Sequence, residues 1–97
     1  MELPFDRTLF KQALSSGDIS WRKHSLERMF ARNISRVEVL EVIENGEVIQ
    51  QYEGDKPFSS ALLLGFPNAR PIHVVISFDE TQPEIFVITA PDFKTRK

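Results

Sequence analysis

The sequence predicts an α+β domain in which N-terminal helices pack on a four-stranded, mostly antiparallel sheet. Up to Asn45, apolar residues recur at helical spacing, whereas after Gly46 four segments rich in branched and aromatic residues alternate with turns. Helices and strands do not alternate, so the helices are expected to cover one face of a single sheet. A length of 97 residues with 41% hydrophobic side chains suits one domain, residues 1–97.

Three helices are expected in the first half of the chain. The first covers residues 5–16 and stops at Gly17, a residue type common just past a helix end. Residues 19–21 form a brief extended piece, and a second helix covers residues 24–32. Ser35 and Glu38 fit a capping box, so the third helix begins at Ser35, and it ends at Asn45-Gly46.

Four strands are expected in the second half, most simply as an antiparallel meander. They cover residues 47–53, 60–66, 71–79 and 84–90, and turn-forming residues separate them. Side chains alternate between the two faces of a strand. In the third strand one face is therefore apolar and faces the core, while His73, Val75 and Ser77 share the other.

Charge is distributed unevenly, although the net charge is only −2. Residues 20–36 carry five basic side chains against Glu27, and residues 37–57 carry six acidic side chains against Lys56. A near-neutral total argues against a protein that coats nucleic acid nonspecifically, but it permits a local basic patch. Two solvated helix faces of opposite sign explain the same pattern.

Composition excludes several classes of site. The chain has no cysteine, which rules out disulfides, thiolate nucleophiles and cysteine-ligated metals, and two histidines make a poor metal site. Its four glycines are isolated, so no phosphate-binding loop is present, and no cofactor or metal is expected. The sequence shows neither a membrane span nor a signal peptide, so we expect a soluble, cytoplasmic protein.

The polar residues that remain match the requirements of metal-independent RNA cleavage. That reaction needs a base for the 2′-hydroxyl proton, an acid for the leaving 5′-oxygen and cations for the phosphorane charge. Histidine and arginine supply these groups near neutral pH. The candidate catalytic residues are His24, Arg28, Arg70 and His73, and the candidate substrate-binding residues are Arg32, Tyr52, Ser77 and Thr89.

Spacing suggests how these residues could meet. His24, Arg28 and Arg32 follow at i, i+4 and i+8 and form one stripe on the second helix. We expect His24 and His73 to face each other across a groove between this helix and the exposed sheet face. The same residues also fit plainer roles, a solvent-facing helix stripe and a hydrogen-bonded strand histidine. A noncatalytic module that binds a protein or a small anionic ligand therefore remains the alternative function.

Several short motifs occur in an order that resembles one bacterial family. They include His24-x3-Arg28-Met29-x2-Arg32, Gly46-Glu47-Val48-Ile49-x2-Tyr52, Leu62-Leu63-Leu64-Gly65, Arg70-Pro71-Ile72-His73 and Val87-Ile88-Thr89. Over residues 19–92 the chain resembles the family catalogued as domain of unknown function forty-two fifty-eight. That family is itself regarded as similar to RelE-like and BrnT-like ribonuclease toxins.

The resemblance implies an endoribonuclease toxin whose partners are RNA and an antitoxin, often a zinc-finger protein encoded beside it. His24, Arg28, Arg32, Arg70 and His73 occupy the matching polar positions. One departure concerns the C-terminal motif, because this chain has Thr89-Ala90-Pro91-Asp92 where such domains usually continue into Val-Tyr. We expect an antitoxin to cover the basic helix stripe with acidic side chains.

Overall fold

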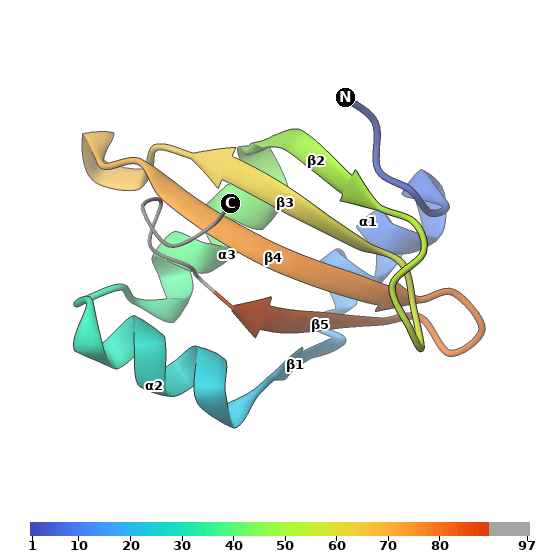
Figure 1. Cartoon of the computed structure of the whole chain (residues 1–97), viewed down its shortest axis with the longest axis horizontal. Coiled ribbons are helices and arrows are strands. Elements are labelled where there is room, and N and C mark those ends of the chain that lie inside the picture. The colour runs from blue at the N-terminus through green and yellow to red at the C-terminus, as the bar shows by residue number, and fades with distance from the viewer. Residues whose placement is uncertain (90–97) are drawn as a thin grey trace.

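The computed structural model of the chain describes residues 1–89 and shows three helices and a five-stranded mixed sheet (Figure 1). It confirms the predicted α+β class. The elements are α1 (Arg7–Ser16), β1 (Ile19–Trp21), α2 (Lys23–Ala31), α3 (Arg36–Asn45), β2 (Glu47–Tyr52), β3 (Ser60–Gly65), the 3-10 turn η1 (Pro67–Ala69), β4 (Ile72–Asp79) and β5 (Glu84–Thr89).

The helix ends follow from local capping. Asp6 accepts a hydrogen bond from the Leu9 amide at the start of α1, and Gly17 ends that helix with a φ of 75°. At the start of α3, the Ser35 hydroxyl accepts from the Glu38 amide and the Glu38 carboxylate accepts from the Ser35 amide. The predicted capping box is therefore confirmed.

The sheet has the strand order β1-β5-β4-β3-β2. Strands β2 to β5 form the predicted antiparallel meander. The prediction of four strands is wrong in one respect, because residues 19–21 add a fifth strand that pairs with β5 in parallel. This three-residue strand has no alternating pattern of its own, and its pairing depends on residues more than sixty positions away. The fourth predicted strand extended to Ala90, which lies outside the described residues.

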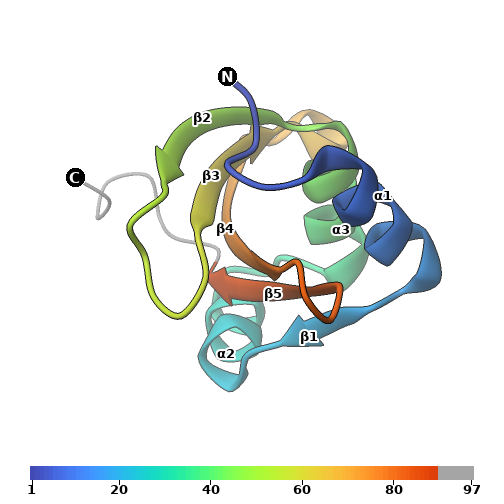
Figure 2. The ribbon, with the colours of Figure 1, turned by 90° about the vertical axis from the view of Figure 1, so that its right-hand side faces the viewer.

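The core lies between the sheet and the helices α1 and α3. Figure 2 shows the sheet curling around these two helices. Buried side chains fill the space between them, among them Phe10, Val39, Val42, Leu63, Val74, Ile76 and Ile85. A Cβ atom at Gly65 would lie 2.9 Å from a Val42 methyl, so glycine allows α3 to approach β3 closely.

Helix α2 packs beside β5 rather than over the centre of the sheet (Figures 1 and 2). Ser25 is fully buried, and its hydroxyl donates a hydrogen bond of 2.9 Å to the carbonyl oxygen of Val87 in β5. Met29, one turn further along the helix, is buried in the core. This contact fixes the helix at the sheet margin and leaves most of its surface exposed.

None of the helices in residues 1–89 is long and apolar enough to cross a membrane.

Candidate functional site

One face of the sheet carries no described helix, and the pairing register identifies its side chains. Tyr52 lies opposite Ser60, Ser60 opposite Ser77, and Ser77 opposite Phe86. Directly paired residues point to the same face, and Ser77 points away from the core residues Ile76 and Phe78. Tyr52, Ser60, Ser77 and Phe86 therefore form one row across four strands on the side opposite the core.

His73 and Thr89 share this face by register. His73 pairs with Leu64 and alternates with the buried residues Ile72 and Val74, so its ring is on the face that carries Ser77. Thr89 pairs with Val75 along the backbone, but its side chain lies outside the described part of the structure. Alternation along β4 thus correctly placed His73 and Ser77 on the face opposite the core. The expectation that this face is exposed is wrong at Ser77, which is only 6% exposed.

The basic stripe, defined as His24, Arg28 and Arg32, lies on the outer surface of α2. His24 and Arg28 are exposed and Arg32 is half-buried. Together with Glu27 and Ala31, these residues line a shallow depression. The Glu27 carboxylate lies 3.4 Å from Nδ1 of His24, one helical turn away.

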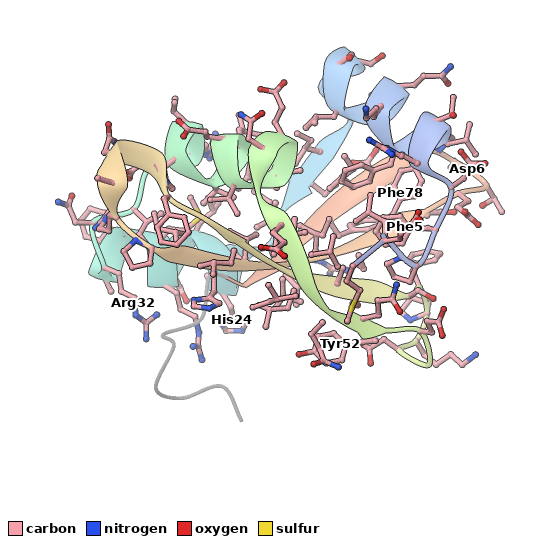
Figure 3. All side chains as sticks on the ribbon, turned by 90° about the horizontal axis from the view of Figure 1, so that it is seen from above. Phe5, Asp6, His24, Arg32, Tyr52 and Phe78 are labelled. Carbon is pink, nitrogen blue, oxygen red and sulfur yellow. The ribbon has the colours of Figure 1, made fainter. Side chains whose placement is uncertain are left out.

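Figure 3 shows how the stripe is oriented relative to the sheet. The labelled side chains of His24, Arg32 and Tyr52 all project to one side, toward the lower edge of the view, whereas Phe5, Asp6 and Phe78 lie on the side of α1. Because α2 sits at the sheet margin, its stripe does not have to face the core-side helices. The stripe and the row on the sheet therefore belong to the same side of the molecule, which we call the outer side.

The surroundings of His73 affect its protonation. Burial lowers the pKa of His73 below its ordinary value of 6.5, because the charged imidazolium loses hydration. The neutral form of the imidazole is therefore favoured at pH 7.

Arg70, which lies two residues before β4, is held by protein groups. Its guanidinium donates to both oxygens of Glu38, at 3.0 and 3.1 Å, and to the carbonyl oxygens of Asn33 and Arg32, at 2.9 and 3.4 Å. Asn68 donates a further bond of 3.1 Å to Glu38. The guanidinium thus ties η1 to the turn between α2 and α3, a role that sequence reasoning did not anticipate.

These contacts change the acidity of Glu38. Its hydrogen bonds with the Ser35 amide, with Asn68 and with Arg70 outweigh the effect of burial and lower the pKa of Glu38 from 4.5 to about 2. The carboxylate therefore stays charged at neutral and mildly acidic pH, where it pairs with Arg70.

Sequence reasoning also missed an aromatic cluster on the outer side. The rings of Phe58 and Phe86 stack with a centroid distance of 5.7 Å and an interplanar angle of 3°. The Arg22 guanidinium carbon lies 5.2 Å from the centroid of the Phe86 ring. Phe86 lies between the buried residues Ile85 and Val87, so alternation along the strand could have placed it on this face. Phe58 could not be placed in this way, because it belongs to an irregular segment.

Within residues 1–89, no group of three or more histidine, aspartate or glutamate side chains has an arrangement that could hold a metal ion.

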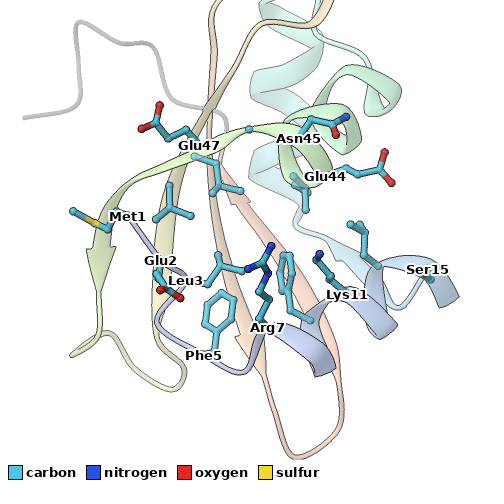
Figure 4. Close-up of a pocket in the computed structure, with 16 residues that line it drawn as sticks. Met1, Glu2, Leu3, Phe5, Arg7, Lys11, Ser15, Glu44, Asn45 and Glu47 are labelled. Atoms are coloured by element: carbon cyan, nitrogen blue, oxygen red, sulfur yellow. The ribbon is translucent and has the colours of Figure 1, made fainter.

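A cavity of about 770 Å³ lies on the core side, between the N-terminal segment, α1, the end of α3 and β2 (Figure 4). Phe10, Ile43 and Leu63 contribute to its apolar lining. Arg7 and Lys11 on α1, together with Glu44 and Glu47, supply charges of both signs. None of the predicted site residues lines this cavity, so it is separate from the outer side.

Comparison with known proteins found a match to one family model. No curated protein and no solved structure matches the chain. The model of the family described as Domain of unknown function (DUF4258) matches residues 21–91, which include α2, the basic stripe and strands β2 to β5. The match spans most of the chain and confirms the resemblance seen in its motifs, and so the protein belongs to the DUF4258 family.

Proposed function

We propose that the protein is a metal-independent endoribonuclease of the toxin–antitoxin type that binds RNA on its outer side. The observation that supports this most is the common orientation of the basic stripe and of the row of sheet residues (Figure 3). Cations for phosphate and groups for proton transfer then face the same ligand.

In the proposed reaction, each of the two proton transfers is carried out by a different histidine. His73, kept neutral by burial, takes the 2′-hydroxyl proton, and the resulting 2′-oxygen attacks the phosphorus. The bond from phosphorus to the 5′-oxygen breaks, and His24 gives that oxygen a proton. The products are a 2′,3′-cyclic phosphate and a free 5′-hydroxyl.

Arg28 is the arginine best placed to hold the phosphate. It is exposed on α2, and no ion pair of Arg28 is found among the described residues. Tyr52 contacts the RNA from the sheet, and Arg32 from the end of α2. Ser77 lies in the same row as Tyr52 but is only 6% exposed. Arg70 acts as a positioning residue, because its bond to the Arg32 carbonyl holds the last turn of α2.

The test is cleavage of a synthetic single-stranded RNA in the presence of EDTA. We expect a product with a 2′,3′-cyclic phosphate from the wild type, and a loss of about 100- to 10,000-fold in rate for His73→Ala. Arg28→Glu should also slow cleavage, whereas Lys11→Glu, which changes a cation on α1, should not. Wild-type protein that leaves the RNA intact, or His73→Ala with full activity, would contradict the proposal.

A noncatalytic binding module is the second candidate, and the pairing of Arg70 supports it. An arginine that is already bound by a carboxylate contributes little to stabilising a transition state. In this case the outer side binds a protein or a small anionic ligand and performs no chemistry. Expression of the protein alone separates the two functions, because a ribonuclease toxin slows growth and a binding module does not.

A further inference from the structure

We propose that Phe58 and Phe86 form a stacking subsite for a nucleobase of single-stranded RNA. This inference rests on the proposed RNA-binding function and adds the part of the ligand that the aromatic cluster recognises. The cluster consists of Phe58, Phe86 and Arg22, which come from the segment between β2 and β3, from β5 and from the residue before α2.

The cluster differs from the aromatic contacts of the core. Phe5, Phe10 and Phe78 meet at interplanar angles of 33° to 79°, as is usual where rings fill an irregular interior. Phe58 and Phe86 are parallel to within 3°. A flat stack of this kind can be continued by another flat ring, which tilted rings do not allow.

The cluster is also accessible. Phe10 and Phe78 are only 3% and 2% exposed, whereas Phe58 and Phe86 are half-buried and Arg22 is exposed. A ring that served only to fill the interior would stabilise the fold more if it were fully buried, because burial of apolar surface is what makes such a ring stabilising. Partial exposure leaves an aromatic surface on which a base can be placed.

The cluster lies between the row of sheet residues and the basic stripe, the two parts of the outer side. Phe86 belongs to the row that contains Ser77 and Tyr52, and Arg22 immediately precedes α2 and its basic stripe. An RNA strand held by Arg28 at one end and by Tyr52 at the other therefore passes the cluster. The Arg22 guanidinium lies over the Phe86 ring and adds a positive charge to the cluster, which favours an anionic strand.

This arrangement favours single-stranded RNA over a duplex. Bases in a duplex are stacked on one another, whereas unpaired bases can stack on aromatic side chains. Every base has a flat face, so such a subsite tolerates different sequences. The substrate class is thus single-stranded RNA, with one unpaired base on the Phe58–Phe86 stack.

The experiment uses a short 2′-O-methyl RNA that contains 2-aminopurine, a base whose fluorescence falls when it stacks. The methyl group blocks attack by the 2′-oxygen, so binding is measured without cleavage. We expect the wild type to quench the fluorescence. Phe58→Leu and Phe86→Leu, which keep an apolar side chain but remove the ring, should reduce the quenching and weaken binding by about 5- to 150-fold.

Phe66→Leu serves as the matched control, because Phe66 is 62% exposed and lies next to η1, outside the cluster. Thermal unfolding shows which variants are folded, and Phe58→Leu alone carries the test if Phe86→Leu does not fold. Unchanged quenching in the folded cluster variants, or no binding by the wild type, overturns the subsite.

The same samples separate this inference from the proposed function. Wild-type cleavage of ordinary RNA with unchanged activity in the cluster variants refutes the subsite and leaves the ribonuclease proposal intact. Quenching that depends on Phe58 in a protein that cleaves no RNA supports the subsite and refutes the ribonuclease proposal.

Discussion

Arg70 and His73 are three residues apart in the sequence, yet the structure gives their side chains different roles. Arg70 follows the 3-10 turn η1, in which Asn68 and Ala69 adopt positive φ angles of 55° and 63°, and its guanidinium reaches Glu38. His73 lies within β4 and points to the outer side. The conformation of the turn, rather than residue type, decides which of the two side chains points to the outer side.

The pairing of Glu38 with Arg70 makes stability depend on pH. The pKa of Glu38 is about 2 in the folded protein against 4.5 ordinarily, so its contribution to stability is present above pH 4.5 and is lost as pH falls toward 2. Glu38→Gln should destabilise the protein by about 1–2 kcal/mol at pH 6, and the difference from wild type should shrink between pH 4.5 and 2.

Thermal unfolding followed by circular dichroism across this pH range checks the prediction. Glu41→Gln, which removes an exposed carboxylate from the same helix, is the control. A Glu38→Gln difference that is independent of pH would show that the carboxylate charge does not stabilise the turn.

At the level of elements, the helices and the four longer strands could be predicted because their signals are local. The capping box at Ser35, Gly17 at the end of α1 and the alternation in β4 all act within a few residues. Strand β1 and the Arg70–Glu38 pair could not be predicted in the same way. Both join residues more than thirty positions apart, and their contacts exist only after the chain has folded.

Under the proposed function, helix α2 is the element that an antitoxin would recognise. If an antitoxin covers the basic stripe with acidic side chains, attraction between the two proteins should weaken as salt screens the charges. Arg28→Glu should therefore weaken binding of such an antitoxin, and so should high salt. Binding measured by calorimetry that is unaffected by both changes would place the antitoxin elsewhere.

At the scale of the whole molecule, two features keep the described helices off the outer side. Helices α1 and α3 both pack inside the curl of the sheet, and α2 is held at the margin by the hydrogen bond from Ser25 to Val87 (Figure 2). The sequence predicted helices on one sheet face, and it predicted the composition of the stripe. It could not predict the direction of the stripe, because that depends on packing of Ser25 and Met29 against distant residues.

The claim that the basic stripe and the outer sheet face form a single RNA-binding surface is tested most directly by NMR. Amide signals of the labelled protein would be followed while an uncleavable single-stranded 2′-O-methyl RNA is added. We expect shifts that gather in α2 and at outward positions of β4 and β5, with α1 and the walls of the cavity unchanged. Shifts confined to α1 and the cavity, or no shifts at all, would contradict it.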